Sequence, residues 1–230
     1  MTHHKSPPDP GLFRCGAVFG IAGVVTALVQ VAINPSYADE PVMAIQQASL
    51  SHFLTFSRVL DMMAFLLLLC GVTVITRAFW TGRGAAWARV AQTLYTVSAT
   101  AGAIATMIVG SLPDIADSWA KASPALKPGY VAVYDALDNA SGAVFSVSWA
   151  ALGGFGMVLA VALRLSPLFS TIVAWISAMS GLALIAAVIV GIGFQAAAAF
   201  VLVVLGLLLS YVVVVALGLK VWRLATEHER

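Results

Sequence analysis

One apolar stretch, residues 51–76 (SHFLTFSRVLDMMAFLLLLCGVTVIT), constrains the fold of this chain more than any other feature. A helix of about 20 apolar residues is long enough to cross the hydrocarbon core of a bilayer. This stretch has that length, yet it carries His52, Arg58 and Asp61 in its first half. A charged side chain is costly to insert at such depth, and it faces the interior of a helix bundle or a water-filled cavity. The stretch therefore predicts a membrane span and also the first place to look for a site.

The composition indicates a protein that is solvated by lipid. Of its 230 residues, 61% are hydrophobic and 10% are charged, with a mean hydropathy of +0.97. A soluble domain carries about a quarter charged residues, so this chain has too little charge for a surface that faces water. The net charge of +2 and the lack of a basic stripe argue against a nucleic-acid partner. The expected partners are membrane lipids and a lipid-like or small-molecule ligand, while the sequence identifies neither a cofactor nor an oligomeric state.

Five further apolar runs accompany this stretch. The predicted spans are residues 13–33, 51–76, 86–110, 140–163, 169–190 and 195–221. Lipid offers the backbone no hydrogen-bond partners, so the sequence predicts an all-α fold, an integral membrane six-helix bundle. It forms a single transmembrane domain over residues 13–222, flanked by a disordered tail at 1–12 and a second tail at 223–230. The first run exceeds the apolar region of about 7–15 residues in a signal peptide, so we take it as a permanent span.

The segments between the spans are predicted to be connections. Residues 111–137 form the longest, and Pro113 followed by Asp114 predicts the start of a short surface helix. Pro124 and Pro128 are expected to break that helix. The other notable connections are residues 34–50, a turn in which Ser166 caps the next helix and Pro167 begins it, and a tight turn at residues 191–193.

Basic residues are distributed unequally between the two ends of the predicted spans. Nine lie on one side and two on the other. The nine are Lys5, Arg14, Arg77, Arg83, Arg89, Arg164, Lys220, Arg223 and Arg230, and the two are Lys121 and Lys127. Cytoplasmic segments of membrane proteins carry the excess of Lys and Arg. The sequence therefore predicts a multi-pass protein of a bacterial plasma membrane, with both termini in the cytoplasm and residues 111–137 outside.

Arg58 and Asp61 lie three residues apart, so a helix places them on one face, where they can pair. Their span runs inward from the outer surface, so Arg58 lies about 10 Å and Asp61 about 15 Å deep at 1.5 Å per residue. Two interpretations stay open, a functional site and a structural ion pair that locks this span to the next. The next span carries a polar stripe that we expect to face other helices rather than lipid. The stripe consists of Arg89, Gln92, Thr93, Thr96, Thr100 and Ala103.

Most strongly polar residues of the spans fall in the outer half of the predicted bundle. They are Gln30, His52, Arg58, Asp61, Asp138, Asn139 and Gln195. Together they predict a ligand pocket that opens outward, and Trp149 in the fourth span is a candidate for its wall. The alternative is that helix ends are more polar than helix centres in any membrane protein.

Two pairs of aspartates on the outer side have metal-ligand spacing. Asp114 and Asp117 form one D-x-x-D pair, and Asp135 and Asp138 form the other. Residues three apart share a helix face, so each pair is a candidate site for one hard divalent cation. Asn139 is the only further ligand beside them. The alternative is solvated loop charge together with carboxylates that favour the positive end of a helix dipole.

The order of these features resembles a known family. Ala86-Trp87-Ala88-Arg89-Val90 opens the third span, and the glycine-rich fourth span runs through Arg164-Leu165-Ser166-Pro167 into the glycine-containing residues 174–181. This pattern resembles a bacterial six-span membrane protein family of unknown function, domain of unknown function 4386. The resemblance covers most of the chain and implies a six-span fold. It brings no activity and no catalytic residue with it.

Three functions agree with these features. The first is non-enzymatic binding or transport of a small molecule or lipid through an outward-facing pocket at Arg58 and Asp61. The second is a membrane-embedded enzyme for a lipid-like or isoprenoid substrate, with Asp61 or the outer aspartates as acid, base or metal ligands. The third is a structural or partner-binding membrane protein. The sequence leaves all three open.

Overall fold

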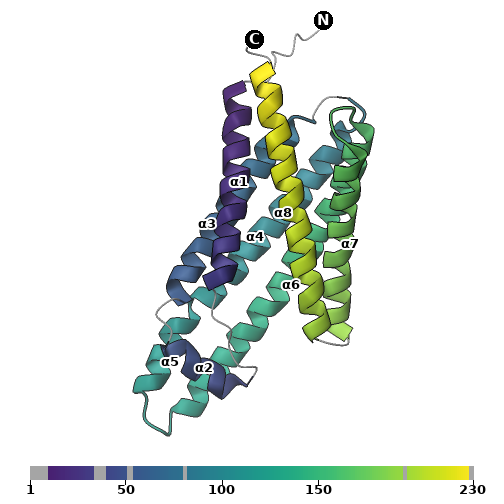
Figure 1. The fold of residues 1–230 in the computed structure, drawn as a ribbon. Helices are drawn as coiled ribbons and strands as arrows, with labels where there is room; N and C mark the ends of the chain where they lie inside the picture. The colour runs from purple at the N-terminus through teal and green to yellow at the C-terminus, as the bar shows by residue number, and fades with distance from the viewer. Residues whose placement is uncertain (1–9, 34–39, 51–53, 80–81, 194–195, 228–230) are drawn as a thin grey trace, which may run out of the picture.

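The computed structural model describes residues 10–33, 40–50, 54–79, 82–193 and 196–227, and every regular element within them is an α-helix (Figure 1). The helices are α1 (Pro10–Ile33), α2 (Pro41–Leu50), α3 (Leu54–Arg77), α4 (Ala85–Gly110), α5 (Leu112–Lys121), α6 (Lys127–Leu165), α7 (Thr171–Gly193) and α8 (Ala196–Glu227). The predicted all-α bundle is confirmed.

Six of these helices are long and apolar enough to cross a membrane, namely α1, α3, α4, α6, α7 and α8. Even α7, with 23 residues, has a length of about 35 Å at 1.5 Å per residue, which exceeds a hydrocarbon core of about 30 Å. A helix satisfies its own backbone N–H and C=O groups, so such runs are stable in lipid. The chain is therefore a multispan membrane protein.

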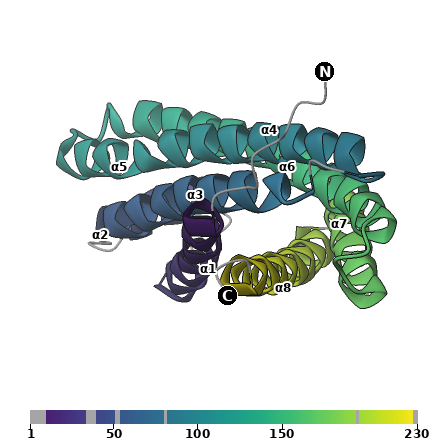
Figure 2. The ribbon, with the colours of Figure 1, turned by 90° about the horizontal axis from the view of Figure 1, so that it is seen from above.

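The six long helices form a closed ring. Helix α1 packs against α3 and α8, α3 against α4, α4 against α6, α6 against α7, and α7 against α8. Seen along the bundle, α4 and α6 lie on one side of the ring and α1 and α8 on the other (Figure 2). Helices on opposite sides barely touch each other. Such a ring encloses an interior that either side chains fill or a cavity occupies.

Glycines set the closest helix crossings in this ring. A Cβ atom added to Gly71 of α3 would lie 2.5 Å from the Cα atom of Gly20, so α1 and α3 cross backbone to backbone. A Cβ atom on Gly156 of α6 would lie 2.8 Å from the carbonyl oxygen of Ser177 in α7. Small residues let helices approach this closely in membranes. Gly153 and Gly156 are accordingly buried between α6 and α7.

Apolar side chains fill the interior at the end of the ring where α1 begins and α8 ends. These two helix ends lie together, because the Arg14 guanidinium is 5.8 Å from the centre of the Trp222 ring (Figure 1). Beneath them, Phe79 stacks on Phe169 with ring centroids 4.5 Å apart. This packing closes one end of the ring.

A smaller cluster of helices lies at the opposite end, and we call it the cap (Figure 1). The cap consists of α2, α5 and residues 127–139 of α6, and it packs Ile45, Leu112, Ala116 and Tyr134 together. Helix α6 has 39 residues, so its length is about 58 Å and exceeds the hydrocarbon core by a wide margin. The cap therefore lies at or beyond one surface of the bilayer.

The long connections contain more helix than the sequence predicts. Part of the predicted connection at residues 34–50 is helix α2. The short helix after Pro113 and its break near Pro124 are confirmed. Pro128 does not break the chain, because it stands in the first turn of α6, where its missing N–H costs no hydrogen bond.

Several predicted helix ends are also wrong. Helix α7 begins at Thr171, and the Ser170 hydroxyl rather than Ser166 accepts a hydrogen bond from the new helix, from the Val173 N–H at 3.4 Å. The predicted turn at residues 191–193 belongs to α7. Helix α1 begins at Pro10 and α8 continues to Glu227, so both terminal tails are shorter than predicted.

The polar stripe of α4 faces outward, so the prediction that it packs against other helices is wrong. Thr96 and Thr100 are exposed. The Thr96 hydroxyl donates to the Gln92 carbonyl oxygen at 3.0 Å, and Thr93 bonds Arg89 in the same way. A hydroxyl satisfied by its own helix can face lipid. The buried face carries mostly small residues instead, among them Ala88, Ala91, Ser98, Ala99, Gly102, Ala105 and Thr106.

Candidate functional site

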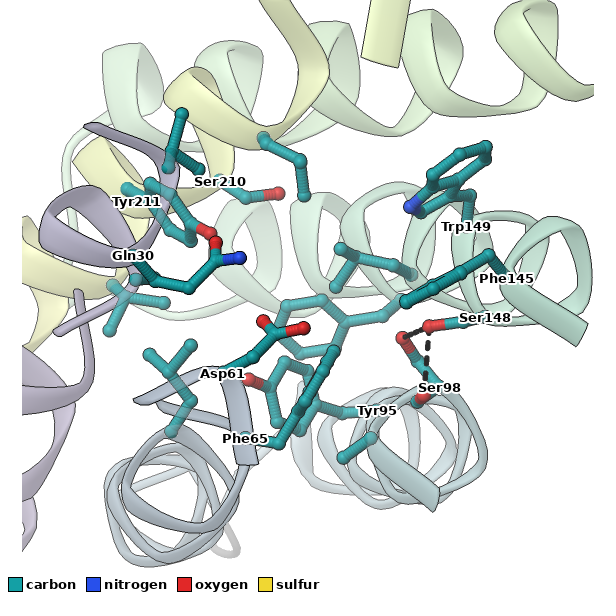
Figure 3. A pocket seen from close by; sticks show the side chains of 18 of the residues that line it. Gln30, Asp61, Phe65, Tyr95, Ser98, Phe145, Ser148, Trp149, Ser210 and Tyr211 are labelled. Carbon is teal, nitrogen blue, oxygen red and sulfur yellow. Dashed lines mark hydrogen bonds between the residues drawn. The ribbon is translucent and has the colours of Figure 1, made fainter. Parts of the chain in front are cut away.

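A cavity of about 280 Å³ lies inside the ring, and we call it the central cavity (Figure 3). Helices α1, α3, α4, α6 and α8 all contribute side chains to its lining. Ligand pockets in proteins measure roughly 300–1,000 Å³ and combine apolar walls with a few convergent polar groups. The central cavity is near the lower end of that range, so it suits a small molecule or one end of a larger one.

Arg58 and Asp61 both line this cavity from α3. The buried Thr106 hydroxyl of α4 donates a hydrogen bond to Asp61 Oδ2 at 3.0 Å. Arg58 acts electrostatically on Asp61 and also on Asp138, which belongs to the cap. Arg58 thus lies close enough to act on a carboxylate of the cavity lining and on one of the cap.

Gln30 of α1 joins these two residues in the cavity lining, as the sequence predicts. Its Nε2 atom donates to the Ser57 hydroxyl of α3 at 3.3 Å, and both side chains are buried. The Gln30 amide and the Asp61 carboxylate point into the same space (Figure 3). The amide and the carboxylate thus meet in the cavity, and Arg58 belongs to the same lining.

Aromatic side chains form the walls. Trp149, the predicted wall residue, lines the cavity and stacks on Phe145, with ring centroids 5.9 Å apart (Figure 3). Tyr95 of α4 packs edge-on against Phe155 with centroids 4.9 Å apart. Tyr211 of α8 completes this group of lining aromatics.

Sequence reasoning missed several polar lining residues, namely Tyr95, Ser98, Ser148, Ser210 and Tyr211. The Ser148 hydroxyl of α6 donates to the Ser98 carbonyl oxygen of α4 at 2.9 Å, which ties two walls together. Tyr211 could have been found, because it stands alone with Ser210 in a long apolar run. Ser98 could have been found only by choosing the other face of α4.

Of the remaining predicted site residues, those that the structure describes do not line the cavity. Asn139 is exposed, and its Nδ2 atom donates to the carbonyl oxygen of Asp135 at 2.9 Å and to its Oδ1 atom at 3.2 Å. His52 and Gln195 lie outside the described residues. Over the part of the chain that the structure describes, no group of three or more His, Cys, Asp or Glu side chains is placed to hold a metal ion. The metal hypothesis for Asp114, Asp117, Asp135 and Asp138 therefore stays a prediction.

The polar side chains of the lining can both donate and accept hydrogen bonds, and they are surrounded by apolar walls. Arg58 and the Gln30 amide donate, Asp61 accepts, and the hydroxyls of Tyr95 and Tyr211 can do either. Hydrogen bonds are electrostatically stronger in such a low-dielectric interior than in water. The cation and the anion of the lining balance each other, so a polar group without net charge is the best match.

Searches of protein-family models, curated proteins and solved structures find no match to this chain. The resemblance to the six-span family of unknown function stays an expectation from the sequence pattern.

Proposed function

We propose that this protein binds a small amphipathic molecule in the central cavity, with the polar end of the molecule at Arg58, Asp61 and Gln30. The observation that carries the proposal is the convergence of these three side chains, from two helices, on one aromatic-walled cavity. A charged side chain inside a membrane is a functional candidate by default.

The purely structural interpretation explains less of this geometry. Thr106 already connects Asp61 to α4, so locking α3 against α4 requires no cavity beside the carboxylate. Close packing normally leaves few voids larger than a water molecule. A cavity of about 280 Å³ next to a half-buried carboxylate favours a ligand-binding role over a purely structural contact.

We place the protein in a bacterial plasma membrane with the start of α1 and the end of α8 in the cytoplasm. The excess of basic residues at that end supports this orientation. The central cavity then lies nearer the outer surface, beneath the cap. A binding protein of this arrangement would take its ligand from the outer leaflet or the outer side, for retention or for transport.

Co-purification tests the proposal. We expect wild-type protein in nanodiscs to carry one molecule of constant mass, detected by native mass spectrometry and absent from empty nanodiscs. Asp61→Asn keeps an acceptor for Thr106 but removes the charge, so it should retain the molecule at least fivefold less. Asp117→Asn is the matched control, because Asp117 is exposed on α5 and away from the cavity lining.

Two results would contradict the proposal. One is a wild-type protein that carries only lipids in the proportions of the surrounding membrane. The other is an Asp61→Asn variant that is folded and retains the same molecule to the same extent as Asp117→Asn.

A further inference from the structure

A second hollow runs along the outside of the ring between α1 and α8, and we call it the lateral groove. It measures about 440 Å³, and every side chain that lines it is apolar except Tyr211. Leu28 of α1 and Leu208, Val212 and Leu219 of α8 line it with 43%, 47%, 52% and 50% of their surfaces exposed. In a membrane these side chains face acyl chains, so the groove is open to lipid.

Among the residues that the structure describes, Tyr211 alone lines both the lateral groove and the central cavity. Its neighbours on α8 divide between the two spaces, since Leu207 and Ser210 line the cavity while Leu208 and Val212 line the groove. Helix α1 divides in the same way, with Gln30 in the cavity and Leu28 in the groove. One tyrosine side chain thus stands at the border between the polar interior and the bilayer.

The packing of α1 against α8 explains why the border lies there. Near the start of α1, Arg14 lies against Trp222, and a Cβ atom on Gly20 would be 3.3 Å from Val214 Cγ1. Toward the cap the two helices diverge (Figure 1). The cavity lies on the cap side of this contact, while the groove passes it on the outside of the ring, from Leu208 to Leu219.

We infer that the ligand of the central cavity is a single-chain lipid with a neutral, hydroxyl-bearing head, and that it enters from the bilayer between α1 and α8, past Tyr211. This inference rests on the proposed function. A hydroxyl group can donate to Asp61 and accept from Arg58 or Gln30, which matches the balanced charges of the lining. The aliphatic groove holds the tail.

The border between the two spaces favours one acyl chain over two. The groove and the cavity share a single described lining residue, so a lipid that spans both spaces has to pass the Tyr211 side chain. A second chain would have to remain in the bulk bilayer or enter a cavity of about 280 Å³ beside the charged pair.

Two probes with the same head separate the groove from the cavity, namely radiolabelled monolauroylglycerol and monobutyrylglycerol. The protein is held in nanodiscs, and the affinity for each probe is measured by equilibrium binding. Leu208→Trp fills the groove, so it should lower the affinity for monolauroylglycerol at least tenfold. The affinity for monobutyrylglycerol should stay within twofold of the wild-type value. Asp61→Asn removes a contact with the head group that both probes share, so it should lower the affinity for both.

Leu182→Trp is the matched control. Leu182 is 50% exposed on α7, a helix that lines neither space, so both affinities should equal those of the wild type. Val212→Phe adds less bulk to the groove and gives the same measurement if Leu208→Trp does not fold. It should also weaken only the long-chain probe.

The outcomes distinguish the two proposals. If Asp61→Asn weakens both probes but groove variants bind monolauroylglycerol like the wild type, lateral entry is overturned and the binding function stands. If the wild type binds neither probe, the neutral hydroxyl head is overturned, and the co-purified molecule alone decides the binding function. If both probes bind equally well to every variant, Asp61 included, both proposals fail.

Discussion

Asp61 is the residue on which the candidate site depends most. It stands inside a membrane span, where an uncompensated charge costs about 3 kcal/mol or more. The hydrogen bond from Thr106 and the positive charge of Arg58 offset part of that cost. Both interactions come from fixed helix positions, so they also hold the carboxylate toward the cavity.

Replacing Thr106 with Val should therefore destabilise the protein. The variant keeps the shape of the side chain but leaves Asp61 Oδ2 without this buried donor, which typically costs about 1–3 kcal/mol. Denaturation of the purified protein in detergent measures the loss of unfolding free energy. Thr96→Val is the matched control on the same helix, because the Thr96 hydroxyl is exposed and bonds its own helix.

We expect the control to stay within about 0.5 kcal/mol of the wild type, as most surface substitutions do. A double variant with Asp61→Asn should show coupling, since the two residues share one contact. Equal losses for Thr106→Val and Thr96→Val would mean that the Thr106 hydroxyl does not restrain Asp61.

At the scale of the helices, the sequence predicts which spans form helices better than it predicts where each helix begins and ends. An apolar run of about 20 residues has no alternative to a helix in lipid, so all six spans could be predicted. Helix α2 could not, because its ten residues owe their stability to packing, with Ile45 completely buried in the cap. The start of α6 could not be predicted either, because a proline such as Pro128 can end a helix or stand in the first turn of one.

The residues of the candidate site also fall into a group that the sequence predicts and a group that it does not. Arg58, Asp61, Gln30 and Trp149 could be predicted, because a polar or bulky residue in an apolar run rarely faces lipid. The contribution of Tyr95 could not, since it depends on which face of α4 turns inward. That choice is made by the closure of the ring and by hydroxyl groups that bond their own helix, and neither appears in a hydropathy pattern.

The α6–α7 crossing gives a prediction at this scale. A Cβ atom on Gly156 would meet the Ser177 carbonyl oxygen at 2.8 Å and the Gly181 nitrogen at 3.0 Å. Backbone cannot move aside as a flexible side chain does, so Gly156→Ala should cost at least the 1–3 kcal/mol typical of overpacking. The unfolding free energy in detergent tests this.

Gly142→Ala provides the control on the same helix. Nothing lies within 4 Å of a Cβ atom there. Alanine has the higher helix propensity, so the variant should be neutral or up to about 1 kcal/mol more stable. If Gly156→Ala matched it, α6 and α7 would not cross as closely as their glycines indicate.

At the scale of the whole molecule, the two ends differ in charge and in shape. The end with the start of α1 and the end of α8 carries most basic residues, and two of its arginines lie over tryptophan rings. Those pairs join Arg14 to Trp222 and Arg164 to Trp175, at 5.8 and 6.0 Å from the ring centres. Basic residues beside aromatic rings are typical of a cytoplasmic membrane interface. In the orientation that we propose, the cap at the other end faces outward.

Cysteine labelling tests this orientation. Cys15 and Cys70 are first replaced with Ser, so that a single new cysteine reports its position. Ser123→Cys lies in the exposed segment between α5 and α6, and Arg83→Cys lies exposed before α4. Arg83 is preferable to its neighbour Gly82, whose φ of 86° disfavours a side chain.

We expect a membrane-impermeant maleimide to label Ser123→Cys in intact cells and to label Arg83→Cys only after permeabilisation. The reverse pattern would place the cap in the cytoplasm. The central cavity, which lies on the cap side of the apolar core, would then take its ligand from the inner leaflet or the inner side. The lateral groove would keep its relation to the cavity, because both are bounded by α1 and α8 in either orientation. Labelling thus decides on which side of the membrane the cavity lies, while the two-probe binding experiment decides whether the lateral groove holds the acyl chain of the ligand.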